Sequence, residues 1–329
     1  MPLRTARFWF VLPILLLALF VSGCTRPPDM ARAAQPDWAV RILGGPVQVA
    51  LVMRTAALLR DPVWGPAIRR SLDKSKSSSE SAGSAGPDVV RGGDALAFSN
   101  TIELYGAIVP GSPYAMGTSE DLRSSDIRLI VVMRQVPPSL NPLAIGGKNG
   151  QATWRPARIL PSGVAEYAPN PNANGYFLYV IPGGTWVLVD GATGPSANRV
   201  FAQTSEAPPL PTFESDALFA AYAGPGIVSL ARAKTQDERA RLAAVEAISF
   251  VMRPGKTGEF VIRVKYTNSD AAKASEREVK DAMEKVGKGD PIVMVILAAL
   301  VSIDLDRDDD VLTLKATLHR ALLDRLARE

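Results

Sequence analysis

The chain has 329 residues, a formal net charge of +4, one histidine and one cysteine. So few histidine and thiol side chains exclude a zinc site built from several of them, and one cysteine excludes an internal disulfide. The near-neutral charge, without a basic face carrying interleaved aromatic residues, argues against a nucleic-acid partner. Hydrophobic residues make up 47% of the chain, which is ample for a core, and 26 glycines with 26 prolines predict many turns between short elements.

The first 24 residues have the pattern of a secretory signal. Arg4 and Arg7 precede the uncharged run 8–20, which is shorter than the about 20 apolar residues that a membrane-spanning helix needs. The run leads into Val21-Ser22-Gly23-Cys24, an aliphatic residue and two small residues before the cysteine. This sequence resembles the lipobox of bacterial lipoproteins.

The resemblance implies cleavage between Gly23 and Cys24 and acylation of the Cys24 thiol. The mature chain would hold 306 residues, 329 less the first 23, and no thiol for catalysis or metal binding. Thr25 follows the cysteine, where the family uses Asp as the signal for the inner membrane. We therefore expect a lipid-anchored protein of the bacterial envelope, on the outer membrane and facing the periplasm.

Composition divides the chain after the signal peptide (1–23) into a tether and two domains. Residues 24–43 begin as a polar, Pro-rich stretch and are expected to link the lipid to the folded part. A strand-rich N-terminal domain is expected over 44–212, with a disordered loop at 73–88 that holds no large apolar residue. An α+β domain is expected over 213–329.

Strand patterns dominate the N-terminal domain. The clearest is a hairpin with arms 176–181 and 185–190 around a Pro-Gly-Gly turn. Both arms are almost wholly apolar, so we expect them to be buried on both faces in the middle of a sheet. Helix-start signals occur near residues 61–66, and a helix is expected within 191–203. Further strands are expected at 46–53, 126–136, 152–160 and 163–169.

The C-terminal domain alternates hairpins with helices. Two hairpins are expected, one over 245–267 and one over 301–318. In the first, Phe260, Ile262 and Val264 alternate with Val261, Arg263 and Lys265, which predicts one buried and one wetter face. Helices are expected at 214–224, 235–245, 270–286, 291–300 and 319–329. The predicted fold is α+β, with antiparallel sheets, helices packed on one face and a C-terminal unit ordered ββααββα; a degenerate duplication of that unit in the middle of the chain is left open.

The chain holds three short Ser/Lys motifs, Ser71-Leu72-Asp73-Lys74, Ser125-Asp126-Ile127 and Lys256-Thr257-Gly258, with Glu166 and Asn170 between them. In this order they resemble the active site of serine β-lactamases and penicillin-binding proteins. Ser71 ends a helical pattern instead of opening one, Ile127 has no amide to donate, and Lys256 lies at a hairpin tip. A Ser/Lys acyl hydrolase is therefore kept only as a remote alternative.

The remaining candidates favour plain structural roles. Residues 304–310 form an acidic stretch that resembles the start of a calcium loop. It has Asp309 and Lys315 where an EF-hand needs Gly and Glu, so a solvated turn is expected. His319 is expected at the surface, and the four tryptophans of the mature chain are expected in the core. The acidic residues are Asp304, Asp306, Asp308, Asp309 and Asp310; the tryptophans are Trp38, Trp64, Trp154 and Trp186.

No catalytic constellation satisfies its own structural context, and no metal or cofactor is predicted. The sequence therefore predicts a non-catalytic envelope lipoprotein, a tethered binding or scaffold module for another envelope protein or a structural polymer. The alternative is a carrier or sensor of an apolar ligand such as a lipid, because the apolar segments 176–181 and 293–300 could line a cavity.

Overall fold

The computed structural model describes residues 34–66, 68–69, 99–112, 115, 126–144, 153–171, 175–209, 216–228, 242–255, 257–286 and 300–318. The described residues form twelve strands, and the strand pairs defined within each unit below are antiparallel. Helices accompany them, which confirms the α+β class. Contacts divide the chain into an N-terminal unit (Arg32–Leu58 and Ser71–Phe213) and a C-terminal unit (Leu59–Arg70 and Glu214–Glu329).

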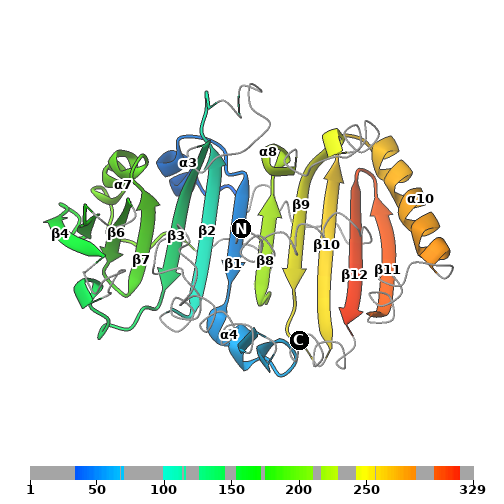
Figure 1. Ribbon diagram of the computed structural model, residues 1–329, viewed down its shortest axis with the longest axis horizontal. Helices are drawn as coiled ribbons and strands as arrows, with labels where there is room; N and C mark the ends of the chain where they lie inside the picture. Colours follow the sequence, from blue (N-terminus) through cyan, green and yellow to red (C-terminus); the bar gives the residue numbers. More distant parts are fainter. Residues whose placement is uncertain are drawn as a thin grey trace, which may run out of the picture. The chain divides into compact units, whose positions relative to one another are not determined.

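The N-terminal unit is a sheet with strand order β1-β2-β3-β7-β6-β5-β4 (Figure 1). Its strands are β1 (Val49–Met53), β2 (Thr101–Ile108), β3 (Ile127–Arg134), β4 (Trp154–Ile159), β5 (Ala165–Pro169), β6 (Tyr176–Ile181) and β7 (Thr185–Asp190). Its helices are α3 (Asp37–Leu43), α7 (Gly194–Phe201) and the 3-10 turn η3 (Pro142–Ala144), while α4 (Thr55–Arg60) crosses the boundary to the C-terminal unit.

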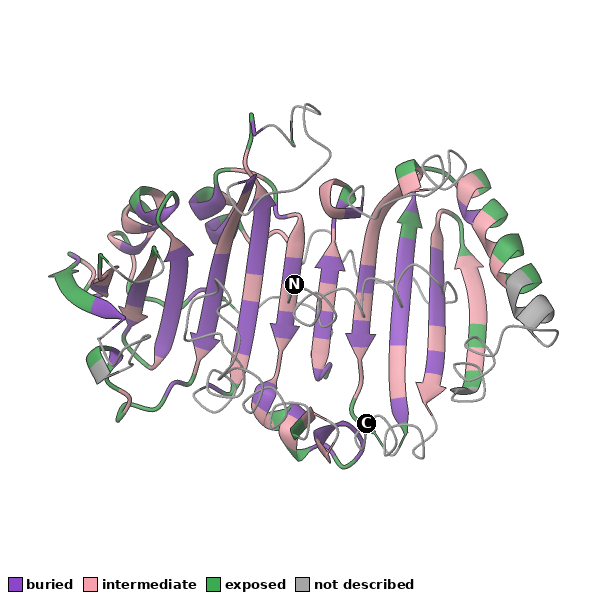
Figure 2. Cartoon of the chain, viewed as in Figure 1, coloured by how far each residue is buried: buried purple, intermediate pink, exposed green. Residues whose placement is uncertain are grey.

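The hairpin β6–β7 confirms the clearest sequence prediction. β7 pairs with β3 and β6, so it lies inside the sheet, and five of its six residues are buried (Figure 2). The turn needs glycine because Gly183 and Gly184 have φ angles of 90° and 85°. At Gly184 a Cβ would lie 2.9 Å from the Val136 carbonyl oxygen, whereas at Gly183 it would meet nothing within 4 Å.

Helices α3 and α7 cover one face of this sheet. The strand registers place Tyr105 of β2 and Tyr179 of β6 on the same face. The Trp38 ring of α3 meets the Tyr105 ring edge-on at 5.1 Å between centroids, and the Phe201 ring of α7 lies 5.0 Å from that of Tyr179. Aromatic packing of this kind fixes both helices against the strands. Helix α3 belongs to residues 24–43, which were expected to form a tether, and this part of the stretch packs on the sheet.

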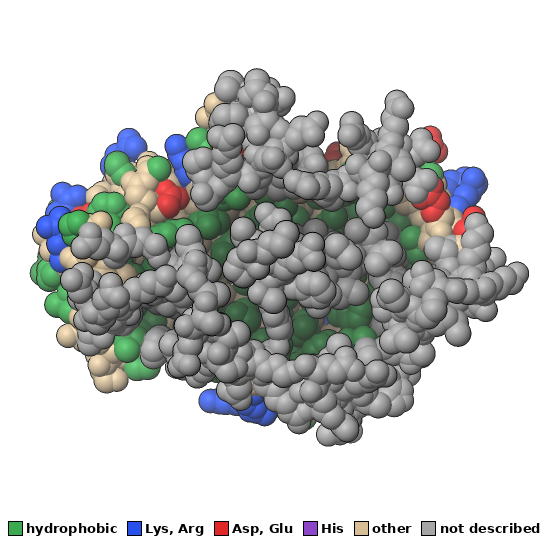
Figure 3. Space-filling model, viewed as in Figure 1, with side chains coloured by type: hydrophobic (Ala, Val, Ile, Leu, Met, Phe, Trp, Pro, Cys, Tyr) green, Lys and Arg blue, Asp and Glu red, His purple; other side chains and the backbone are tan. Residues whose placement is uncertain are grey.

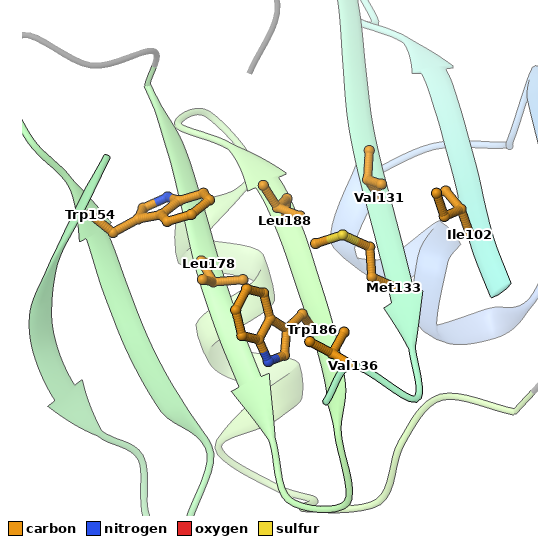
Figure 4. Packing of buried hydrophobic residues seen from close by; sticks show 8 residues of the cluster. All are labelled: Ile102, Val131, Met133, Val136, Trp154, Leu178, Trp186 and Leu188. Carbon is orange, nitrogen blue, oxygen red and sulfur yellow. The ribbon is translucent and has the colours of Figure 1, made fainter. Parts of the chain in front are cut away.

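The opposite face of the N-terminal sheet carries a second apolar cluster (Figure 4). Figure 4 shows these side chains on one side of the strands, with Trp186 between Leu178 and Val136. Because the sheet has an apolar cluster on each face, its central strands read as continuous apolar runs without alternation. The buried members are Ile102, Val131, Met133, Val136, Trp154, Leu178, Trp186 and Leu188.

The C-terminal unit is a sheet with strand order β11-β12-β10-β9-β8 (Figure 1). Its elements are β8 (Phe219–Ala223), α8 (Pro225–Val228), β9 (Val245–Met252), β10 (Gly258–Tyr266), α10 (Ser269–Val286), β11 (Leu300–Asp308) and β12 (Val311–Leu318). The early segment 59–70 belongs to this unit. There Asp61 Oδ1 accepts hydrogen bonds from the Val63 and Trp64 amides, both at 2.8 Å, and Trp64 Nε1 donates to the Arg253 carbonyl oxygen at 3.3 Å.

Helix α10 packs on one face of this sheet. Its first turn is capped by Asn268, whose side-chain oxygen accepts a hydrogen bond from the Ala271 amide at 2.9 Å. Ala272 is fully buried and Val279, two turns later, packs against the same cluster. The predicted helix over 270–286 is thus confirmed within one residue. The core beneath it is formed by Ile262, Val264, Tyr266, Leu312, Leu314 and Ala316.

Two predictions for the C-terminal domain are wrong. The expected helix over 214–224 contains strand β8, because Phe219–Ala223 pairs with β9 and this pairing overrides the helix preference of its alanines. The expected wetter face of β10 is largely buried, since Val261 is 0% and Arg263 7% exposed, and only Lys265 is exposed among its predicted outward residues within the strand.

Several expectations lie outside the described residues. They are the signal peptide, the loop at 73–88 and the helices at 291–299 and 319–329, together with most of the helix at 235–245. Within the described part, the C-terminal unit follows the predicted sequence of hairpin β9–β10, helix α10 and hairpin β11–β12.

Candidate functional site

A row of polar side chains crosses the C-terminal sheet. The strand registers pair Tyr222 of β8 with Ser249 of β9, and Ser249 with Arg263 of β10. They continue by pairing Arg263 with Thr313 of β12, and Thr313 with Asp306 of β11. Directly opposed residues of an antiparallel sheet point to the same face and lie about 5 Å apart, so the five side chains form one line.

Alternation along the strands fixes the face that carries this polar row. Ile262 and Val264, on either side of Arg263, belong to the core beneath α10. Leu312 and Leu314, on either side of Thr313, belong to the same core. Because successive side chains of a strand point to opposite faces, the polar row lies on the face away from α10.

The centre of the polar row is buried. Tyr222 and Ser249 are each 5% exposed, Arg263 is 7% exposed and Thr313 is 4% exposed. Burying a guanidinium and hydroxyls costs free energy that apolar residues in a plain structural sheet would avoid. The arginine presents five N–H donors in a fixed fork, and the hydroxyls beside it can donate or accept. This set of donors suits a carboxylate or phosphate group.

Charged pairs border the polar row. Lys265 Nζ lies 2.8 Å from Glu246 Oε2, with both side chains nearly half exposed. Asp304 on β11 stands opposite Lys315 on β12. These pairs keep the outer part of the face hydrophilic, while Asp306 places a negative charge at one end of the row.

The N-terminal unit has a buried carboxylate that is fully engaged. Glu103 is 0% exposed and accepts hydrogen bonds from Tyr105 Oη at 2.9 Å, Arg134 Nη2 at 3.2 Å and Arg134 Nε. Burial, then the charge of Glu103, raise the pKa of Tyr105 far above its ordinary value. Because both carboxylate oxygens and the tyrosine proton are held, this cluster joins β2 to β3 and offers no group to a substrate.

A second carboxylate of the N-terminal unit is engaged in the same way. Glu166 Oε2 lies 2.5 Å from Arg158 Nε, and Glu166 Oε1 accepts a hydrogen bond from Asn198 Nδ2 at 3.1 Å. Burial, then the nearby Glu166, raise the pKa of Tyr179. Glu166 therefore links β4, β5 and α7.

Most residues singled out from sequence lie outside the described part of the chain. Cys24 and Gly23 of the lipobox are outside it, as are Ser71, Lys74, Ser125, Lys256 and His319. Of the described motif members, Asp126 is buried beside β3 in the N-terminal unit, and Gly258 begins β10 in the C-terminal unit. The lipobox and the Ser/Lys hypothesis therefore stay predictions.

Asp309 and Asp310 of the acidic stretch form the predicted hairpin turn, whereas Asp304, Asp306 and Asp308 belong to strand β11. Asp309, with φ of 51°, lies at the tip between β11 and β12, and its carbonyl oxygen accepts a hydrogen bond from Arg307 Nη1 at 3.2 Å. The Asp310 carbonyl oxygen accepts the Tyr266 amide at 2.9 Å. In the described ranges, no group of three or more His, Cys, Asp or Glu side chains is placed to hold a metal ion.

The core assignment of the four tryptophans is confirmed. Trp38, Trp64, Trp154 and Trp186 are between 1% and 7% exposed, so the described tryptophans form no sugar-binding platform. The polar row was missed from sequence, although the pattern Phe260-Val-Ile-Arg263-Val holds its signal, a charged residue within an apolar strand.

No protein-family model matches this chain, and no curated protein sequence matches it. Among solved structures, crystal form I of TP0453, a Treponema lipoprotein, aligns with a TM-score of 0.41 and 12% sequence identity. The alignment covers 89% of this chain and 97% of that chain. The likeness is distant and carries no argument about what this chain does. Within the described residues, no helix combines the length and apolar character needed to cross a membrane.

Proposed function

We propose that this chain is a non-catalytic bacterial lipoprotein, anchored through Cys24 to the outer membrane and acting in the periplasm as a tethered binding module. The observation that carries the proposal is Val21-Ser22-Gly23-Cys24 directly after a short apolar run with a basic head. Acyl chains on Cys24 would hold the protein at the membrane, and both folded units follow the cysteine in the chain.

The polar row is the site that we assign to binding. Arg263, flanked in register by Ser249 and Thr313, is suited to a carboxylate or phosphate group of an envelope protein or structural polymer. The row is buried, so a ligand can bind only when these side chains become accessible. A site of this kind binds without needing a nucleophile, a metal or a cofactor.

The side chains of β6 support a binding module over a carrier of an apolar ligand. Leu178 packs in the cluster with Trp186, and Tyr179 packs against Phe201 on the other face. Both side chains are 0% exposed. The described apolar arm thus fills two cores and leaves little space for a lipid beside it.

The anchor is tested by intact-mass analysis of the protein from native membranes, with Cys24→Ser as the comparison. The expected wild-type mass is that of a chain starting at Cys24 with acyl chains, and the variant should leave the membrane fraction. Incubation with a fluorescent penicillin belongs to the same experiment, because an adduct on Ser71 would establish the hydrolase instead. A retained, extractable lipid would establish the carrier.

The binding role is tested by cross-linking in intact envelopes followed by capture of the anchored protein. Arg263→Met is expected to lose a partner that wild type and Arg263→Lys capture. The matched control is Arg277→Met on the exposed side of α10, where capture should be unchanged. Equal capture by all four proteins would show that the polar row binds no partner.

A further inference from the structure

Strands β4 and β11 are edge strands, each paired with one neighbour in its unit. β4 ends the order of the N-terminal unit and is paired with β5, and β11 ends the order of the C-terminal unit and is paired with β12. An edge strand presents backbone donors and acceptors to another chain, and proteins control that exposure with charge, proline and bulges. The side chains of β4 and β11 therefore determine what these two edges can bind.

The β4 edge is basic on one face and apolar on the other. Arg155 stands opposite Ala168, and Arg158 stands opposite Glu166, across a bulge that shifts the register between them. Since positions 166 and 168 of β5 share a face, the bulge turns both arginines to that face. Five of the six β4 residues are exposed (Figure 2), and Lys and Arg side chains gather at this end of the unit (Figure 3).

Ile159, the last residue of β4, supplies the apolar part of this edge. Its side chain is 76% exposed, and its register partner Ala165 places it on the face opposite the arginines. A single exposed aliphatic side chain is common on protein surfaces, so Ile159 contributes to a contact only together with the charged side chains of the same strand.

The β11 edge has the complementary pattern. Asp304, Asp306 and Asp308 alternate along the strand and so share one face, with Asp304 and Asp308 exposed. Ile303, Leu305 and Arg307 lie on the other face, where Ile303 packs against the core beneath α10 and Arg307 Nε donates to Glu276 Oε2 at 2.9 Å. This edge is therefore acidic on one face, and its other face combines two half-buried aliphatic side chains with Arg307.

We propose that β4 of one copy docks beside β11 of a second copy. Two β4 edges would bring arginines together, and two β11 edges would bring aspartates together, so the charges oppose both symmetric pairings. A β4 edge meeting a β11 edge brings opposite charges together. The two strands can run in the direction that puts the arginines and the aspartates on the same face. In that arrangement Ile159 lies on the same face as Ile303 and Leu305.

This contact joins two different surfaces of the chain, so it does not pair one edge with a second copy of the same edge. Pro156 lacks an N–H and the bulge interrupts the edge, so the backbone ladder between copies is short. The contact is accordingly weak and depends on side-chain charge. Proteins tethered to one membrane would meet at high local concentration, although the contact itself does not depend on the anchor.

Sedimentation velocity of the full-length protein in mild detergent, over a concentration series, tests the proposal. At about 0.02 M salt the protein should form oligomers that grow with protein concentration. At about 0.5 M salt they should dissociate, because the salt then screens charges that lie more than a few ångströms apart. A wild-type protein that stays monomeric at low salt throughout the series would overturn the proposal.

Charge exchange identifies the two edges. Arg155→Glu alone, and Asp304→Lys with Asp308→Lys alone, should each weaken association at least about tenfold. An equimolar mixture of these two proteins should associate again, as should one chain carrying all three changes. Arg277→Glu on α10 is the matched control and should associate like wild type. A monomeric mixture, or an Arg155→Glu protein that associates normally, would show that these edges do not meet.

Substituting Ile159 tests the same contact without changing any charge. Ile159→Ser should weaken association, whereas Leu143→Ser, which alters the other exposed large hydrophobic residue of the described part, should not. Because both side chains are exposed in the single copy, the melting temperatures of both variants should match wild type. Equal association of these two variants would remove the apolar half of the proposed contact.

Discussion

The two units share a strand order and differ in how they bury charge. The N-terminal unit contains the order β1-β2-β3-β7-β6, and the C-terminal unit contains β8-β9-β10-β12-β11. In both, three consecutive strands lie side by side. The second strand of a later hairpin, β7 or β12, then pairs with the third of them. A short helix follows the first strand in each, α4 after β1 and α8 after β8.

What lies between the third strand and the returning hairpin distinguishes the units. The N-terminal unit inserts the strands β4 and β5, which extend its sheet, and the C-terminal unit inserts α10, which covers a face. The degenerate duplication suggested by sequence stays a prediction. A common framework can thus be extended by strands in one case and covered by a helix in the other.

The treatment of buried charge separates the units more sharply. In the N-terminal unit, buried Glu103 and Glu166 are each held by an arginine. In the C-terminal unit, buried Arg263 stands in register between two hydroxyl residues, and the described ion pairs lie nearer the surface. The comparison teaches that the first unit uses buried charge to join its strands, while the second keeps a cationic group in a hydroxyl-rich setting.

Breaking the Glu103 pair should give the largest effect. Arg134→Met leaves a buried carboxylate without its cation and should cost about 3–5 kcal/mol of unfolding free energy. Adding Glu103→Gln to the same chain should recover most of that loss. Urea unfolding followed by tryptophan fluorescence measures both variants, and a double variant as unstable as the single one would show that the pair does not carry this energy.

Replacing a glycine in the β6–β7 turn should give the next largest effect. Gly184→Ala forces a Cβ against the Val136 carbonyl oxygen and should cost about 2–3 kcal/mol. Gly183→Ala, with a similar φ angle but open space around the Cβ, is the control for backbone strain alone and should cost about 1 kcal/mol. Equal thermal shifts for the two variants would contradict the crowding at Gly184.

Arg263→Met should have a smaller effect on stability than Arg134→Met. Methionine keeps the length of the buried side chain but removes its charge and its hydrogen bonds, so we expect a loss of about 1–2 kcal/mol. Urea unfolding under the same conditions measures it. A loss as large as that of Arg134→Met would make Arg263 a structural charge and would erase the contrast between the units.

Glu276 on α10 should give the smallest effect, one that depends on pH. Hydrogen bonds from Lys280, at 2.7 Å, and from Arg307, at 2.9 Å, lower its pKa. A folded pKa below the unfolded value of about 4.3 stabilises the protein above that pH, and the benefit is lost as pH falls through the folded pKa. Because these pairs are partly exposed, Glu276→Gln should cost at most about 1 kcal/mol at pH 7.

The check on Glu276 is a set of urea midpoints for wild type and Glu276→Gln between neutral and acidic pH. The difference between the two proteins should shrink as the pH falls and vanish once wild-type Glu276 is protonated. A difference that stays constant with pH would mean that the side chain acts through packing. Lys273→Gln, on an exposed position of the same helix, is the control.

The sequence by itself determined the local elements of this protein. The hairpin β6–β7, the hairpins of the C-terminal unit and α10 were all predictable, because a Pro-Gly-Gly turn, a short polar turn and a helical stripe act between residues close in sequence. The same local reasoning placed the four tryptophans in the core and Asp309 and Asp310 in a turn. It also predicts a lipobox, a signal that is read from consecutive residues.

Only the tertiary structure decided which strands became neighbours. The strand β8 resembles a helix in sequence and became a strand because β9 offered it a partner. Arg263, Ser249 and Thr313 are far apart in sequence and form a row only through the registers of three strands. Strand pairing is a non-local interaction whose free energy depends on partners that no local pattern names, which is why the candidate site appeared only in the folded chain.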